Sequence, residues 1–481
     1  MRLNENTPLS AVRPRHRQAL LVAGASLLIC ALSPLASAIG LNTAYEKALQ
    51  YDSELAAAQA GRQVISEDVN RSRARLLPQL GATAGADYTD QSVDADGTVQ
   101  PTTVVPGGDP VVAQGAGRTG DDSYKTYSAG VSVSQVLYDA SAYNELEAAR
   151  KSSSRAEQEY RQAVLTLTFS SAQAYFNVLR AIDELSTSRR AEAAFERQWE
   201  QARERFDVGL IAITEVQESR AIFDAGKVER INAEGQLDIA LEDLERLTGL
   251  SVEEINVLAE DYPILDPTKV PVSEWEALAY ANNPELLAAA LSVDAAAELL
   301  KARKADLYPT INATASYGYS QFAGQSPIDT EVTQGVVGLN LNLPLYLGGG
   351  ARAGIRQAHY QHIQAEEIGS TVRRNVRLQV RSLYRNLRTN VEAIQARQQQ
   401  IISSESALEA TRAGYDVGTR NVVEVLQAES AYYQALSDFA NARYDYIINS
   451  LSLLRAAGKL GEDDIMQLNQ WLNRPVQISS L

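Results

Sequence analysis

The hydrophobic positions of this chain follow two periods, and each period predicts its own kind of element. Long stretches without proline carry apolar residues at spacings of three and four, the pattern of a helix buried along one face. From Ala140 to Phe206 the chain has neither proline nor glycine, enough for a helix of about 100 Å. We expect coiled-coil helices over about residues 139–248 and 350–457. The clearest apolar stripe consists of Val372, Val376, Val380, Leu383, Leu387, Val391 and Ile394.

Four shorter segments alternate apolar and polar residues with a period of two, which predicts β-strands. They cover about residues 79–90, 124–138, 309–320 and 335–346. One face of each strand would be apolar and the other small and polar, as in the strands of a membrane barrel with lipid outside and water inside. A soluble sheet with two different faces is the alternative interpretation.

The two halves of the chain repeat one plan. Ala82-Thr83-Ala84 recurs as Ala313-Thr314-Ala315, and Gly249 near the end of the first half matches Gly458 near the end of the second. Such an internal repeat predicts two similar units, each with two strands and long helices. The expected divisions are a first repeat at 39–258, a linker at 259–271, a second repeat at 272–470 and a C-terminal tail at 471–481.

Residues 1–38 have the features of a secretory signal peptide. Basic residues precede an apolar run, and Ala36-Ser37-Ala38 is a small-residue cleavage site. A single N-terminal membrane anchor is the alternative. Cys30, the one cysteine of the chain, lies inside the apolar run, so the mature protein would have no thiol chemistry and no disulfide.

A membrane-spanning part of the mature protein would have to be a β-barrel. No later stretch approaches the roughly 18 apolar residues of a spanning helix. Four strands do not close a barrel, because the smallest membrane barrels use about eight. An open sheet in lipid would leave its edge groups unpaired. The sequence therefore predicts that several copies complete the barrel.

Each helical region is interrupted once, by nearly the same sequence. The first copy is RFDVGLIAITEVQ at residues 205–217, and the second is GYDVGTRNVVEVL at residues 414–426. Glycine permits the positive φ at which one helix ends and the next turns back. We therefore predict the tips of two helical hairpins, at Gly209 and Gly418.

These tips, together with residues 77–81, 174–179 and 440–444, resemble the TolC family of outer-membrane exit ducts, over essentially the whole mature chain. The resemblance implies a mainly α-helical homotrimer with a 12-stranded barrel in outer-membrane lipid, four strands from each copy, and a periplasmic α-helical tunnel. It implies a passive channel without cofactors, used in multidrug efflux, type I secretion or both. A periplasmic adaptor and an inner-membrane efflux transporter or secretion ATPase would open it.

The resemblance also assigns roles at the tips. Tyr415 and Arg420 are expected to bond to the first tip of the same or a neighbouring subunit and hold the periplasmic mouth closed. Glu424 would form an acidic ring around the channel axis, and Gln427 replaces a second acidic ring, which weakens the expected cation selectivity. Glu204 replaces a neutral amide and would offer Arg420 a charged partner. The residues that match the gate are Glu204, Thr214, Glu215, Tyr415, Arg420, Glu424 and Gln427. Those that match the adaptor-docking tips are Val208, Gly209, Leu210, Val417, Gly418 and Thr419.

Charge and candidate chemistry narrow the function further. The net charge of −16 argues against nucleic-acid binding. The sequence has no phosphate loop and no set of catalytic Ser, His and Asp, so we do not expect an enzyme. His359, His362 and Glu366 are spaced for a surface metal site, but a solvated helix face is the expectation and no metal site is predicted.

The tip residues alone are also consistent with simple helix capping. Two other functions stay open: a non-conducting structural or adhesive trimer that spans the periplasm, and a soluble coiled-coil scaffold, which the signal peptide and the strands disfavour.

Overall fold

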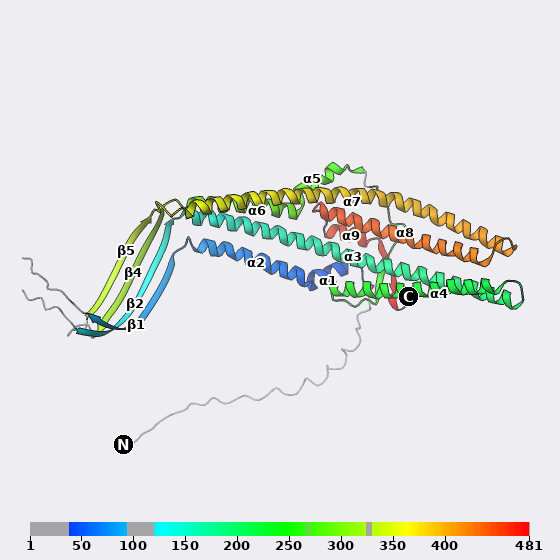
Figure 1. The fold of residues 1–481 in the computed structure, drawn as a ribbon, viewed down its shortest axis with the longest axis horizontal. Helices are drawn as coiled ribbons and strands as arrows, with labels where there is room; N and C mark the ends of the chain where they lie inside the picture. Colours follow the sequence, from blue (N-terminus) through cyan, green and yellow to red (C-terminus); the bar gives the residue numbers. More distant parts are fainter. Residues whose placement is uncertain (1–37, 94–119, 267–268, 324–329, 481) are drawn as a thin grey trace, which may run out of the picture.

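The computed structural model describes residues 38–93, 120–266, 269–323 and 330–480. The expected signal peptide, apart from its last residue, lies outside this range. The molecule is long and narrow, with the four long strands at one end and both helical tips at the other (Figure 1). Among the residues described, no helix is both long and apolar enough to cross a membrane.

The two halves share one order of elements up to the end of their second long hairpin helix, and the second half adds one more α-helix and a short 3-10 helix. The paired long helices have 68 and 67 residues, and the paired helices that precede the strands have 22 each. The first half consists of α1 (Leu41–Tyr51), α2 (Ser53–Ala74), β1 (Gln79–Val93), β2 (Gly120–Tyr138), α3 (Ala140–Asp207), α4 (Ile213–Thr248) and β3 (Glu254–Leu258). The second consists of α5 (Val272–Asn282), α6 (Pro284–Ala305), β4 (Thr310–Ala323), β5 (Thr330–Asn342), α7 (Gly350–Asp416), α8 (Val422–Ala456), α9 (Glu462–Asn469), β6 (Leu472–Gln477) and the short 3-10 helix Ile478–Ser480.

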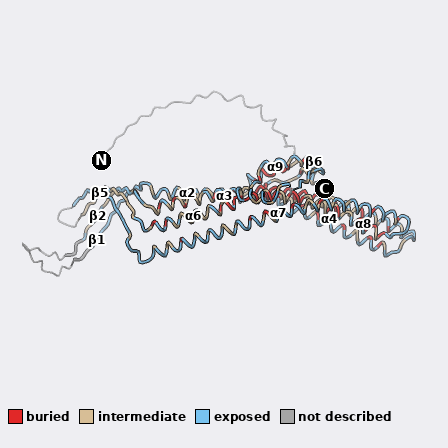
Figure 2. The backbone as a smooth tube through the Cα atoms, turned by 90° about the horizontal axis from the view of Figure 1, so that it is seen from above, coloured by how far each residue is buried: buried red, intermediate tan, exposed pale blue. Residues whose placement is uncertain are grey.

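The long helices α3 and α7 each pack against two shorter helices in succession. Helix α3 contacts α2 and α4, and it also joins the halves through α6 and α8. Helix α7 contacts α6 and then α8. The apolar stripe predicted on α7 is confirmed, because all seven of its residues belong to the main core or pack against it. Buried residues concentrate in the middle of the molecule and along the tip-side half of the helices (Figure 2).

The long strands form one antiparallel sheet in the order β1-β2-β4-β5. Its register brings like residues side by side: Leu80 pairs with Val133, Val133 with Ala315 and Ala315 with Val337. In the adjacent row, Gly81, Ser132 and Ser316 are polar or small, as the predicted alternation requires, and Val336 is the exception. The apolar face is open to the surroundings, with Val337 88% exposed.

Both outer strands of this sheet have a single neighbour in the described structure. Strand β1 pairs with β2, and β5 pairs with β4, so the far edge of each is left without a partner strand. Strand β5 lies earlier in the chain than the expected 335–346 and ends at Asn342. Pro344 explains the end of the ladder, because proline has no N–H to donate.

A small second sheet in the middle of the molecule connects segments that lie far apart in the sequence. Strand β3 pairs with β6, so part of the segment expected as a C-terminal tail is a strand. Ile39 joins the edge of this sheet through hydrogen bonds with Glu254 and Asn256. The buried hydroxyl of Tyr175 on α3 lies 2.7 Å from the carbonyl oxygen of Asn256 and 3.0 Å from that of Ile39. The phenol therefore ties the long helix α3 to the sheet that joins Ile39, β3 and β6.

Candidate functional site at the helical tips

Both helical tips turn through the same backbone motif. Gly209 and Gly418 have φ values of 80° and 79°, as the sequence predicts. At the first tip Gly209 N–H donates to Phe206 O and Leu210 N–H donates to Arg205 O, each at 2.8 Å. At the second, Gly418 and Thr419 make the corresponding bonds at 3.0 and 2.8 Å. These paired bonds are the Schellman motif, which satisfies the last carbonyls of a helix and needs a left-handed residue.

The two tips contact each other through Arg205 and Tyr415. The guanidinium carbon of Arg205, at the end of α3, lies 4.3 Å from the centre of the Tyr415 ring, at the end of α7. This is a cation–π arrangement, which strengthens when the groups are shielded from water. Tyr415 is 8% exposed and belongs to a small core with Phe195, Val216 and Leu426.

The hydroxyl of Tyr415 is buried and has no hydrogen-bond partner within the described chain. Burial raises the pKa of Tyr415 above its usual value of 10. The charge of Glu215, on the first tip, raises this pKa further, whereas Arg205 lowers it. Two residues of the first tip, Arg205 and Glu215, thus act on the Tyr415 phenol of the second tip.

Arg420 has a different partner in the chain from the one suggested by the sequence. Its guanidinium forms an ion pair with Glu424, one turn further along α8. Glu204 has no ion-pair partner among the described residues, so the suggested link from Glu204 to Arg420 is not made within one chain. Asn421 caps α8 by accepting a hydrogen bond from Glu424 N–H at 2.9 Å, which fixes the first turn that carries the pair.

The other predicted tip residues lie on the outside of the hairpins. Glu204, Thr214 and Gln427 are exposed, and Glu215 is partly buried in the first turn of α4. The residues that match the adaptor-docking tips are also exposed: Val208, Gly209, Leu210, Val417, Gly418 and Thr419. Val208, Leu210 and Val417 are more than two-thirds exposed, at 71%, 72% and 75%. Each tip therefore presents a small apolar surface around its glycine.

Two interactions near the tips were not foreseen from the sequence. Arg205 was not singled out, although it stands where the second copy has Gly414, and this difference between the copies was a usable signal. Arg412 of α7 forms an ion pair with the carboxylate of Glu429 of α8, whose side chain is 1% exposed. The pair holds the two helices of the second hairpin together next to the tip.

The described structure offers no metal site at the tips or elsewhere. No group of three His, Cys, Asp or Glu side chains in the part of the chain described is arranged to hold a metal ion. His362 Nδ1 lies 3.9 Å from the carboxylate of Glu366, while the ring of His359 faces Tyr360. The interactions that the tips show are an ion pair, a stacked cation and exposed apolar groups.

Comparison with known proteins gives a consistent result. The sequence profile of the outer membrane efflux protein family matches residues 44–250 and 275–459. The chain is 34% identical over 461 residues to the outer membrane protein TolC of Escherichia coli (strain K12), covering 94% of this chain and 88% of that protein. It is 28% identical over 451 residues to the alkaline protease secretion protein AprF of Pseudomonas aeruginosa, covering 92% and 89% of the two chains.

A solved structure has the same fold at lower sequence identity. The Campylobacter jejuni CmeC outer membrane channel superimposes with a TM-score of 0.73 at 16% identity. The similarity covers 92% of this chain and 90% of that one. At this identity the likeness concerns the fold.

Proposed function

Because the chain belongs to the outer membrane efflux protein family, we propose that its helical tips are the gate of a trimeric exit duct. The resemblance to the TolC family is confirmed by the match over 94% of the chain. The protein is an outer-membrane exit duct for efflux and type I secretion, and its relatives include both TolC and a protease secretion protein.

The four-stranded sheet supports the trimeric part of the proposal. Its apolar face is exposed, and β1 and β5 each have one free edge in the described structure. In lipid, unpaired edge groups are costly, so β1 of one copy would pair with β5 of the next until the sheet closes. Three copies would give 12 strands, a number within the known range of membrane barrels.

The observation that carries the gate proposal is the contact between Arg205 and Tyr415, which joins the two tips. The buried Tyr415 hydroxyl without a partner suits a bond to a neighbouring subunit, because a buried polar group is stabilised by a hydrogen bond. The ion pair of Arg420 with Glu424 would keep the acidic ring nearly neutral while the pair is intact. A partner that draws Arg420 away would leave three unpaired carboxylates around the axis and favour opening by repulsion.

The exposed tips support docking of partner proteins. Val208, Leu210 and Val417 offer apolar contact, and glycine at each turn lets another helix approach closely. The proposed partners are a periplasmic adaptor and, through it, an inner-membrane efflux transporter or secretion ATPase. Energy for transport would come from that transporter.

The gate is tested by the single-channel current of the purified mature protein in a planar bilayer. We expect small, cation-preferring currents, and currents several-fold larger from a variant with Tyr415→Phe and Arg420→Ser. The matched control is Arg220→Ser. It removes the i,i+4 ion pair between Arg220 and Asp224 on α4, which takes no part in the contact between the tips. The control should conduct like the unaltered protein.

Two outcomes would contradict the proposal. Equal currents from the unaltered protein and the double variant would exclude the tips as the gate. Inserted protein that carries no current in either form would exclude a conducting duct and favour the structural trimer instead.

A further inference from the structure

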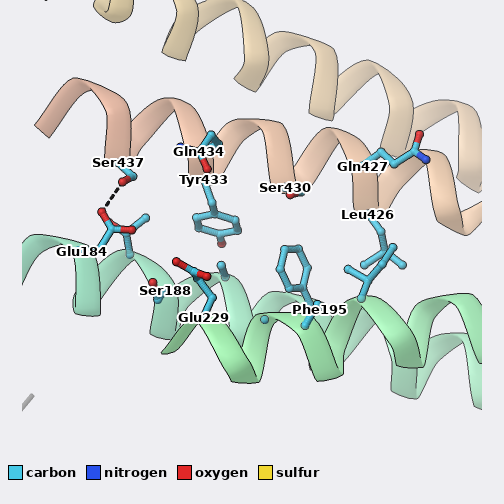
Figure 3. Close-up of a pocket in the computed structure, with 15 residues that line it drawn as sticks. Glu184, Ser188, Phe195, Glu229, Leu426, Gln427, Ser430, Tyr433, Gln434 and Ser437 are labelled. Atoms are coloured by element: carbon cyan, nitrogen blue, oxygen red, sulfur yellow. Dashed lines mark hydrogen bonds between the residues drawn. The ribbon is translucent and has the colours of Figure 1, made fainter. Parts of the chain in front are cut away.

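A cavity of about 520 Å³ lies between α8 and the hairpin of α3 and α4, next to the gate (Figure 3). Its volume is in the range of small-molecule sites, roughly 300–1,000 Å³. Its lining residues come from α3, α4 and α8. Gln427 forms part of its wall, one turn after Glu424.

Two carboxylates line this cavity. Glu184 of α3 and Glu229 of α4 approach it from one side, and Glu184 accepts a hydrogen bond from the hydroxyl of Ser437 on α8. No lysine, arginine or histidine is among the lining residues described. Neither carboxylate forms an ion pair within the described chain, whereas Glu192 and Glu234 on the same two helices both pair with Arg230.

Two aromatic rings form the apolar part of the wall. Phe195 of α3 and Tyr433 of α8 meet edge to face, with ring centres 6.3 Å apart and planes at 87°. Gly226 makes room for this arrangement, because a Cβ atom there would lie 2.7 Å from Cδ2 of Phe195. Any side chain at Gly226 would displace the Phe195 ring. Glycine in mid-helix costs stability, so its presence here is consistent with a need to keep this space.

Three arginines act on Tyr433 without lining the cavity: burial raises the pKa of Tyr433, and Arg197, Arg190 and Arg412 each lower it. The guanidinium of Arg190 bonds to the carbonyl oxygen of Ser186 and, at 3.4 Å, to the hydroxyl of Thr187, and Arg412 pairs with Glu429. The two carboxylates, neither of which is in an ion pair within the described chain, therefore border an unfilled space together with two rings. This combination favours a cation over a neutral or anionic molecule.

We propose that this cavity is a binding site for a drug-sized organic cation that carries an aromatic ring. The ammonium group lies between Glu184 and Glu229, and the ring packs against Phe195 and Tyr433. The occupant touches both α8 and the α3–α4 hairpin. The inference goes beyond the exit duct and holds whether or not the chain conducts.

The test compares two probes of the same shape by equilibrium titration of the purified mature protein in detergent. 2-Naphthylmethylamine is a cation at pH 7, and 2-naphthylmethanol is its neutral counterpart. We expect the amine to bind saturably and roughly tenfold more tightly than the alcohol, because charge-assisted hydrogen bonds are the stronger kind. Glu229→Gln should remove most of this difference, and Gly226→Ala should weaken both probes several-fold by moving Phe195.

Matched variants on the same helix separate the site from general effects. Glu242→Gln removes an equal charge from an exposed position, and Gly235→Ala adds a Cβ where no atom lies within 4 Å. Both should bind the two probes like the unaltered protein. Equal affinities for amine and alcohol would overturn the proposal. Full binding of the amine by Glu229→Gln, or unsaturable uptake by every variant, would overturn it as well.

Discussion

Arg205 at the end of α3 stacks on Tyr415 at the end of α7, with 4.3 Å between the guanidinium carbon and the ring centre. The two residues come from different copies of the repeated tip and occupy different positions in it. Arg205 stands where the second copy has Gly414, and Tyr415 stands where the first copy has Phe206. A Cβ atom at Gly414 would lie 2.8 Å from Cγ of Arg420, so glycine there accommodates Arg420. The differences between the copies thus create the contact between the tips.

Arg205→Ala is expected to open the gate even though it leaves Tyr415 and Arg420 in place. A partly shielded cation–π contact stabilises by about 1 kcal/mol, and its loss changes an opening equilibrium about fivefold. Single-channel recording should show the open state several-fold more often. The control is Arg203→Ala, which removes an exposed arginine two residues earlier in α3. Unchanged opening in Arg205→Ala would show that the stacked pair does not hold the tips together.

Arg412→Met is expected to destabilise the second hairpin strongly. Glu429 is 1% exposed, and its other carboxylate oxygen already lacks a partner within the described chain. Loss of Arg412 leaves a buried charge uncompensated, which costs about 3 kcal/mol, the low end of the usual range because Arg412 is itself half-exposed. Thermal melting and protease cleavage near the tip measure the effect.

Adding Glu429→Leu to Arg412→Met should restore most of that stability, since no buried charge then remains. Arg388→Met serves as the control, because its ion pair with Glu392 is exposed and contributes little. If the single and double variants have the same melting temperature, the buried charge is not the cause of the lost stability.

Features with a local period could be predicted from the sequence. The stripe from Val372 to Ile394 repeats every three or four residues, so its burial along one seam of α7 followed from the pattern alone. The two tips were predictable because Gly209 and Gly418 break otherwise continuous helices. The strands were predictable because the alternation that they show, as at Leu80 and Gly81, matches the pleat.

Features that depend on distant partners could not be predicted in this way. Within α2, Leu55 is the only buried residue, so no apolar stripe marks this helix in the sequence. Helix α6 is rich in alanine, which also hides an apolar stripe. Strand β3 pairs with β6 from the far end of the chain, and neither is long enough to show a period. The sequence offers Arg420 two possible carboxylate partners, Glu204 and Glu424. The structure pairs it with Glu424, because residues four apart at the start of a helix lie on the same side.

The middle of the molecule is expected to lose stability at alkaline pH through Tyr262. Burial, and secondly the neighbouring Tyr446, raise the pKa of Tyr262 from 10.0 to about 12. The folded protein therefore holds this proton more tightly than the unfolded chain does. The resulting stabilisation is complete below pH 10 and is lost as the pH rises from 10 through about 12.

Melting temperatures measured across that alkaline range test this linkage. Tyr262→Phe keeps the edge-on ring contact with Trp471 at 5.8 Å but has no proton to lose. Its melting temperature should fall less steeply with pH than that of the unaltered protein. Tyr360→Phe, at a 67% exposed position, should follow the unaltered protein. Parallel slopes for Tyr262→Phe and the unaltered protein would contradict the assignment.

Gln427→Glu is expected to make the duct more cation-selective and more easily blocked by divalent cations. In the proposed trimer, the change adds three carboxylates one turn from Glu424, and closely spaced like charges bind a multivalent cation more tightly than a monovalent one. Arg420 neutralises Glu424 within each chain, so the new carboxylates would contribute most of the free charge. The Mg²⁺ concentration that halves the single-channel current should fall roughly tenfold, as expected for added charges close to the axis. Gln217→Glu adds the same charge to the other hairpin, on α4, and should change the block much less if α8 lines the axis. Equal block in both variants would mean that Gln427 does not face the channel axis.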